Sequence, residues 1–143
     1  MSENLLATAT VTIDASPERV WAALTDPAII RKYMFGSTVT SDWEVGSTIT
    51  YAGEYEGKQY EDHGEILEIR PGALLRSTHF SPLSGQPDVP ENYHTLTYTL
   101  RSEGNGTHLE LTQDNNSNAA EVEHSTANWQ QMLDALKSVV EEQ

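Results

Sequence analysis

The last part of the chain, residues 118–142, carries apolar residues at intervals of three and four. This spacing predicts one long helix with a single apolar stripe that lies on another layer of structure. Asn118 with Glu121 forms a capping-box-like pair, which favours a helix start at this point. At about 1.5 Å per residue the helix would span a small domain, so it requires a broad apolar surface. The stripe consists of Val122, Trp129, Met132, Leu133, Leu136, Val139 and Val140.

The beginning of the chain predicts one strand and two short helices. Residues 7–13 are rich in Thr and β-branched residues, which favours a strand. Ser16-Pro17 and Asp26-Pro27 each combine a capping side chain with Pro at the first helical position. These pairs predict two abutting helices, the second of which ends at Gly36.

Between these helical parts, apolar and polar residues alternate with a period of two. The alternation predicts antiparallel strands at 45–55, 60–69, 73–80, 93–101 and 107–113, joined mostly by turns with Gly or Pro. Residues 81–92 contain three Pro and one Gly and predict a long loop, of the kind that is often functional. The fold class is therefore α+β, a curved antiparallel sheet of six to seven strands with helices on one face.

Composition narrows the class of protein. The 143 residues fit a single domain, expected over residues 1–143, and the absence of Cys excludes disulfides and Cys-rich zinc sites. Eight basic against 22 acidic residues give a net charge of -14, which argues against binding of nucleic acid. The chain shows neither a signal-peptide pattern nor an apolar run of about 20 residues, so we expect a cytoplasmic protein without membrane insertion.

Short strings spread from about residue 7 to residue 140 carry a family resemblance. With the order of elements, they resemble the helix-grip superfamily (START-like, birch-pollen-allergen-like). More specifically, they resemble the family named for the activator of the heat-shock-protein-90 ATPase, in its bacterial single-domain form. The strings include Ser16-Pro17-Glu18-Arg19-Val20-Trp21, Ser41-Asp42-Trp43, Gly64-Glu65-Ile66-Leu67-Glu68-Ile69, Gly106-Thr107-His108-Leu109 and Asn128-Trp129.

The resemblance implies a curved sheet that grips the C-terminal helix, with an apolar cavity between them. Members of such folds bind lipids, sterols, polyketides or aromatic small molecules, and some are cyclases or dehydratases. The eukaryotic namesake stimulates a chaperone ATPase and uses a second domain, for which these 143 residues leave no room. Fold alone does not select among these functions.

Strand alternation selects the polar residues that would edge such a cavity. If Leu67 and Ile69 face the terminal helix, the polar residues two and four positions before Leu67 face it as well. The inward residues of strands 73–80 and 107–113 add three more polar groups. The predicted polar edge is His63, Glu65, Ser77, His79 and Gln113, and the predicted apolar lining is Ile49, Tyr51, Leu96, Tyr98, Trp129, Met132 and Leu136. A few polar groups in an apolar pocket are typical of a small-molecule site.

Three functions remain open at this point. The first is a monomeric protein without a cofactor that binds an apolar or aromatic small molecule between helix and sheet, entering near the loop 81–92. The second is a co-chaperone that docks on a heat-shock chaperone through its outer surface. The third is a small cyclase or hydro-lyase in which His79 or Glu65 acts as acid or base.

Simpler alternatives stand beside these functions. A buried His or Glu is costly unless paired, so His63 and Glu65 are also explained as partners of neighbouring groups or as an exposed strand end. His63, Glu65 and His79 match no zinc-binding spacing, so no metal is expected. The chain has no Cys, and no Ser lies in a recognisable nucleophile motif.

Overall fold

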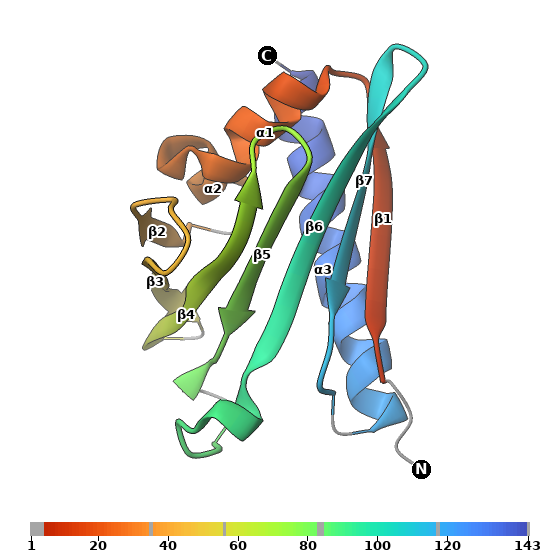
Figure 1. The fold of residues 1–143 in the computed structure, drawn as a ribbon. Coiled ribbons are helices and arrows are strands. Elements are labelled where there is room, and N and C mark those ends of the chain that lie inside the picture. Colours follow the sequence, from red (N-terminus) through yellow and green to blue (C-terminus); the bar gives the residue numbers. More distant parts are fainter. Residues whose placement is uncertain (1–4, 35, 56, 83–84, 117, 143) are drawn as a thin grey trace.

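A computed structural model describes residues 5–34, 36–55, 57–82, 85–116 and 118–142. Seven antiparallel strands form one sheet in the order β1-β7-β6-β5-β4-β3-β2. In Figure 1, α3 runs along one face of this sheet, behind β6, β7 and β1, and α1 and α2 close one end. The elements are β1 (Ala7–Ile13), α1 (Pro17–Thr25), α2 (Pro27–Tyr33), β2 (Thr38–Ser41), β3 (Thr48–Tyr55), β4 (Lys58–Arg70), β5 (Leu74–His79), the 3₁₀ helix η2 (Pro90–Asn92), β6 (His94–Glu103), β7 (Gly106–Gln113) and α3 (Ala119–Glu141). The predicted α+β fold with a gripped C-terminal helix is confirmed.

The helix starts predicted from capping residues are confirmed by hydrogen bonds. Ser16 Oγ accepts a hydrogen bond from the N–H of Arg19 at 3.3 Å, and one carboxylate oxygen of Asp26 accepts from the N–H of Ala28 at 3.0 Å. At the start of α3, Asn118 Oδ1 accepts from the N–H of Glu121 at 2.8 Å. Each cap satisfies a backbone N–H that the first helical turn leaves without a partner.

The region before β3 differs from the prediction. The predicted strand 45–55 begins only at Thr48, and an additional short strand, β2, precedes it. Between them Trp43 adopts a positive φ of 57°, and Ser47 Oγ both accepts from the N–H of Glu44 at 3.2 Å and donates to its carbonyl at 2.6 Å. These contacts close a turn, so residues 42–47 cannot continue a strand.

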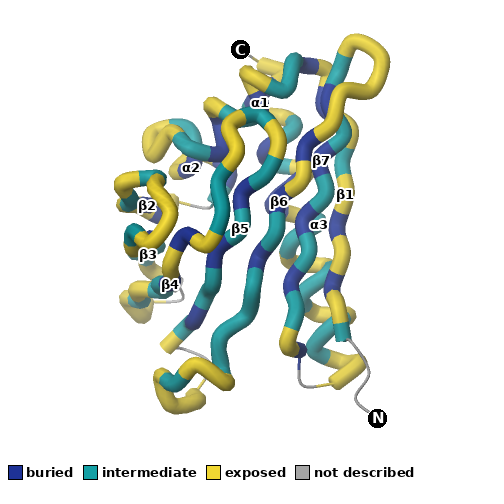
Figure 2. Tube along the Cα trace, in the orientation of Figure 1, coloured by how far each residue is buried: buried dark blue, intermediate teal, exposed yellow. Residues whose placement is uncertain are grey.

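The apolar stripe of α3 packs on the concave face of the sheet. Met132, Leu133, Leu136 and Val140 are buried, and Trp129 and Val139 pack partly buried against the same core. Along β1, β6 and β7 in Figure 2, buried residues alternate with intermediate or exposed ones, as expected for a sheet with one covered face. Within the described residues, no helix is long and apolar enough to cross a membrane.

A β-bulge in β4 reverses the faces of its residues. The pairing register with β5 shifts between Ile66 and Glu68, so the buried Ile66 faces the core and Leu67 is 41% exposed. Because a bulge inserts one extra residue, alternation counted back across it gives the opposite face. The predicted inward orientation of His63 and Glu65 is therefore wrong, and both lie on the outer face of the sheet.

Candidate functional site

Polar side chains from neighbouring strands meet on the concave face of the sheet. Tyr51 on β3 and Asp62 on β4 are directly opposite each other in the strand register. The ring of His79, at the end of β5, lies 5.7 Å from the ring of Tyr51, and its Nε2 lies 3.3 Å from Asp62 Oδ2. Ser77, also on β5, is buried. The predicted inward orientation of Ser77 and His79 is confirmed, because no bulge interrupts β5.

The helix contributes Trp129 to the same region. The indole ring stands edge-on to His79, with ring centres 6.4 Å apart. Its Nε1 donates a hydrogen bond of 2.7 Å to Oε1 of Gln113, whose own amide donates to Asn116 Oδ1 at 2.7 Å and to Ser125 Oγ at 3.1 Å. Gln113 thus faces inward as predicted, and its hydrogen bonds hold the first half of α3 against β7.

Asp62 is a carboxylate that lies within reach of both His79 and Tyr51. Its side chain is 18% exposed and that of His79 15%. Burial raises the pKa of Tyr51 above its ordinary value of 10.0, and the negative charge of Asp62 raises it further, while a hydrogen bond with Ser77 lowers it. Among the described side chains, Asp62 Oδ1 is the one buried polar atom without a hydrogen-bond partner.

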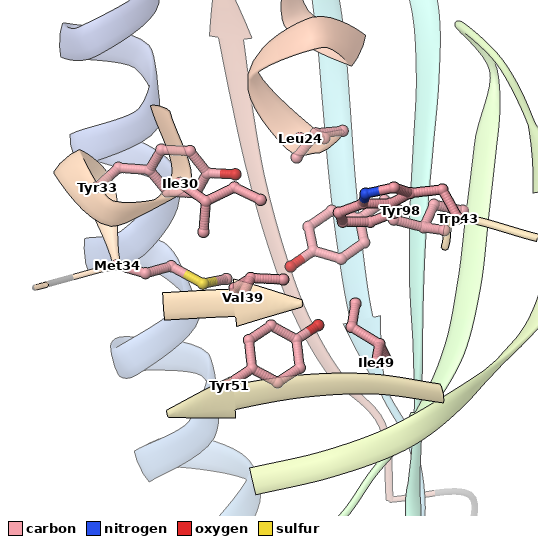
Figure 3. Close-up of a pocket in the computed structure, with 10 residues that line it drawn as sticks. Leu24, Ile30, Tyr33, Met34, Val39, Trp43, Ile49, Tyr51 and Tyr98 are labelled. Carbon is pink, nitrogen blue, oxygen red and sulfur yellow. The ribbon is translucent and has the colours of Figure 1, made fainter. Parts of the chain in front are cut away.

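The core between the sheet and helices α1 and α2 leaves little empty space. A cavity deeper in the core has a volume of about 10 Å³, close to the minimum for one water molecule. Figure 3 shows Tyr51 and Tyr98 among the side chains around it. This cavity is much smaller than the open apolar hollow that the resemblance implied. The lining residues are Leu24, Ile30, Tyr33, Met34, Val39, Trp43, Ile49, Tyr51, Leu75 and Tyr98.

Of the residues predicted to line an apolar cavity, some line the small cavity and others are buried elsewhere in the core. Ile49, Tyr51 and Tyr98 line the small cavity. Leu96, Met132 and Leu136 are buried, but they do not line it. Asp62 was not predicted. Asp62 lies four positions before the buried Ile66, so alternation counted from Ile66 would have placed it on the inner face. The prediction counted from Leu67 instead, which is exposed.

A larger concavity lies on the outer face, between β4 and the segment that leads into β6. It has a volume of about 410 Å³ and is open to solvent. His63 Nε2 lies 3.0 Å from Asp88 Oδ2 and 2.9 Å from the hydroxyl of Tyr93. We call this concavity the outer groove. It is lined by Thr48, His63, Gly64, Glu65, Thr78, Asp88, Pro90 and Tyr93.

Aromatic and charged contacts fix the wall of the outer groove. The ring of Tyr93 stacks on that of Phe80, with centres 5.2 Å apart. The Tyr93 hydroxyl donates a hydrogen bond to Asp88 Oδ1, which raises the pKa of Tyr93 from 10.0 to about 12. Asp88, Pro90 and Tyr93 thus border the outer groove. The predicted role of the loop 81–92 at the inner cavity is not supported by these contacts.

The geometry of the sheet and α3 agrees with a comparison to known families. Residues 14–141 match the family model of the activator of Hsp90 ATPase homolog 1-like protein. The chain belongs to this family. No curated protein sequence matches it at a significant level.

Solved structures extend the comparison of this family member. The solution structure of ChR145 from Cytophaga hutchinsonii is 49% identical, with 99% of this chain and 97% of that chain covered and a TM-score of 0.86. The Aha1 dimer from Colwellia psychrerythraea is 22% identical, with 95% and 96% covered and a TM-score of 0.75. DynU16, from the dynemicin biosynthetic locus, is 17% identical, with 97% of this chain and 48% of that chain covered and a TM-score of 0.80. The last two likenesses show the fold alone.

We call Tyr51, Asp62, Ser77, His79 and Trp129 the inner cluster, which brings together one carboxylate and one imidazole. Within the described residues, no group of three His, Cys, Asp or Glu side chains is placed to hold a metal ion. The Asp62–His79 pair can accept and donate hydrogen bonds, and the rings of Tyr51 and Trp129 offer aromatic surface.

Proposed function

We propose that this family member binds an apolar or aromatic small molecule between α3 and strands β3 to β5, against Tyr51, His79 and Trp129. The supporting observation is the polar cluster on the concave face of the sheet. A closed core would bury apolar side chains at these positions, whereas here an acid, an imidazole and a phenol lie beside an indole.

Binding in this place requires α3 and the sheet to separate locally. The cavity next to Tyr51, which no residue of α3 lines, has a volume of about 10 Å³ and cannot hold an organic molecule. α3 packs mainly against β1 and α2, and its first half is tied to β7 by the hydrogen bonds of Gln113. A ligand that enters beside Trp129 would therefore displace side chains on the β3 to β5 side while the contact between α3 and β1 remains.

The opening sets the energetics of binding. Burial of apolar surface contributes about 25 cal/mol per Å², from which the costs of association and of opening are subtracted. A binding-competent state that is only fractionally populated weakens the apparent affinity by that fraction. The origin of DynU16 in a natural-product locus is in keeping with this proposal, although that protein shares only the fold.

The experiment is a titration of the isotopically labelled full chain, followed by NMR, with flavonoid-like, sterol and fatty-acid ligands. We expect shifts of the Trp129 indole N–H, the Met132 methyl group and the Tyr98 ring with at least one ligand class. Trp129→Ala should weaken binding, while His63→Ala, on the outer face, should leave it unchanged. If no ligand moves these inner signals, or if Trp129→Ala binds as tightly as the unaltered chain, the proposal is wrong.

The outer groove favours a second candidate, recognition of another protein such as a heat-shock chaperone. This groove has a volume of about 410 Å³ and is open to solvent, and the net charge of -14 would steer a basic surface towards the protein. In that case, added chaperone should shift Thr48, Thr78 and Tyr93 and leave the Trp129 indole signal in place. Shifts confined to inner residues on addition of chaperone would contradict this candidate.

A further inference from the structure

We infer that the molecule bound at the inner cluster carries a hydroxyl group on an aromatic ring, and that this hydroxyl donates a hydrogen bond to Asp62 Oδ1. The inference rests on the proposed function and names the class of its ligand. The two carboxylate oxygens of Asp62 differ in their contacts. Asp62 Oδ2 lies 3.3 Å from His79 Nε2, whereas Oδ1 is buried and receives no hydrogen bond from any described group.

A buried acceptor without a partner is rare in folded proteins and destabilises the fold unless a donor reaches it. The described neighbours do not supply that donor. The indole N–H of Trp129 already donates to Gln113 at 2.7 Å, and the Tyr51 hydroxyl is hydrogen-bonded with Ser77. The unpaired oxygen therefore marks the point where a ligand gains a hydrogen bond that the free protein does not make.

The number of unpaired acceptors limits the chemistry of the donor. The cluster offers one such oxygen, and a hydroxyl brings one O–H donor. An ammonium group brings three N–H donors, and two of them would find no unpaired buried acceptor among the described side chains. A carboxylate would be repelled by Asp62, since like charges at short range in a buried site are costly. A neutral hydroxyl is the donor that fits.

The rest of the ligand follows from the rings around the acid. Tyr51 is the cross-strand partner of Asp62, and the His79 ring lies 5.7 Å from the Tyr51 ring and 6.4 Å from the Trp129 ring. The His79 and Trp129 planes are inclined at 81°, so the two rings form a T-shaped pair. An aromatic ring placed among them can form edge-to-face or offset contacts, which are the preferred geometries of ring pairs. A phenol-type group combines that ring with the single donor.

The test uses matched ligands that differ in one hydrogen-bond donor. In 2-methoxynaphthalene a methyl group replaces the hydroxyl hydrogen of 2-naphthol, so the two share their ring system. We expect the unaltered protein to bind 2-naphthol about tenfold more tightly than the methyl ether, the value for one hydrogen bond to a charged acceptor. 2-Naphthoate should bind more weakly than both. Dissociation constants are measured by NMR titration of the Trp129 indole signal at neutral pH.

Variants of Asp62 connect the preference to the carboxylate. Asp62→Leu removes the acceptor at similar volume and should abolish the preference for 2-naphthol. Asp62→Asn keeps the shape of the side chain but replaces the charged acceptor by a neutral amide oxygen, so it should reduce the preference for 2-naphthol several-fold. This variant replaces Asp62→Leu in the test if the Leu variant does not fold. Asp88→Asn, which removes a carboxylate from the outer groove, is the matched control and should retain the full preference.

The outcomes separate this inference from the proposed function. A preference for 2-naphthol that falls in the Asp62 variants and persists in Asp88→Asn supports the inference. Equal binding of 2-naphthol and its methyl ether, tighter binding of 2-naphthoate, or a preference unchanged by Asp62→Asn overturns it and leaves small-molecule binding intact. If neither 2-naphthol nor 2-methoxynaphthalene binds while another ligand class does, the inference about the hydroxyl is wrong and the proposed function remains. Failure of every ligand class overturns the proposed function as well.

Discussion

Gln130 on α3 makes two hydrogen bonds to the backbone of one residue, Thr10, on the edge strand β1. Its Nε2 donates to the Thr10 carbonyl at 2.8 Å, and its Oε1 accepts from the Thr10 N–H at 3.3 Å. Further along α3, Lys137 Nζ donates a hydrogen bond to the Thr12 carbonyl at 2.8 Å, and Glu141 Oε2 accepts one from the Asp14 N–H at 2.8 Å. The helix thus occupies backbone groups that an edge strand would otherwise offer to another chain.

Gln130→Ala should expose this edge. We expect faster hydrogen exchange of the Thr10 amide and a loss of about 1 kcal/mol in the free energy of unfolding, because exposed hydrogen bonds contribute modestly. Exchange is measured residue by residue by NMR, and stability by urea denaturation. Gln131→Ala is the control, since Gln131 lies exposed on the same helix. Equal exchange of the Thr10 amide in both variants would show that the Gln130 contact does not protect the edge.

Ile66 and Leu67 provide a direct test of the bulge in β4. Ile66 is fully buried, whereas Leu67 is 41% exposed. Ile66→Ala should lower the free energy of unfolding by about 3 kcal/mol, through lost apolar burial and a residual cavity. Leu67→Ala should cost less than about 1 kcal/mol. Chemical denaturation of the two variants gives the comparison, and a larger loss for Leu67→Ala would mean that strand β4 has the opposite register.

Gly64 is required by the close approach of β4 and β5. A Cβ atom at this position would lie 1.8 Å from the carbonyl oxygen of Thr78. Gly64→Ala should therefore force the strands apart and lower the free energy of unfolding by about 3 kcal/mol, at the upper end for overpacking. Gly57, with a positive φ of 81° and open space around it, is the comparison. Gly57→Ala should cost only about 1 kcal/mol of backbone strain. Similar thermal stability of both variants would contradict a close contact at Gly64.

Tyr93 should titrate at unusually high pH because of Asp88. The hydrogen bond to this carboxylate raises the Tyr93 pKa from 10.0 to about 12. The unfolded chain loses this phenolic proton near pH 10 while the folded chain keeps it, so the stability from this contact is present below pH 10 and is lost as the pH rises through 12. Asp88→Asn should lower the Tyr93 pKa towards 10.

The titration is followed by NMR of ring-labelled tyrosine. Tyr93→Phe assigns the signal, and the buried Tyr33, Tyr51 and Tyr98, whose pKa values burial raises, serve as internal references. If the Tyr93 signal in Asp88→Asn titrates at the same pH as in the unaltered chain, Asp88 does not set this pKa.

Local signals were sufficient for most of the fold. The Ser16, Asp26 and Asn118 caps depend on residues at most three positions away, so the sequence shows both partners of each contact. The same is true of the alternation in β5, which correctly placed Ser77 and His79 on the inner face. Family membership followed from strings of this kind and was confirmed over residues 14–141.

The site required the tertiary structure. His63 and Glu65 were assigned to the wrong face, because the bulge between Ile66 and Glu68 forms only where β4 pairs with β5. Asp62 was missed for the same reason. Its contact with His79 joins two residues that lie 17 positions apart in the sequence.

From the sequence alone it was possible to place the starts of the helices, the apolar stripe of the last helix and the family of the chain, since these depend on neighbours along the chain. The tertiary structure was needed to see that the cavity beside α1, α2 and the sheet has a volume of only about 10 Å³, and that one carboxylate oxygen of Asp62 is left unpaired among the described side chains. Both depend on how side chains from distant segments fill a shared volume, and the pattern of one segment contains no record of that volume.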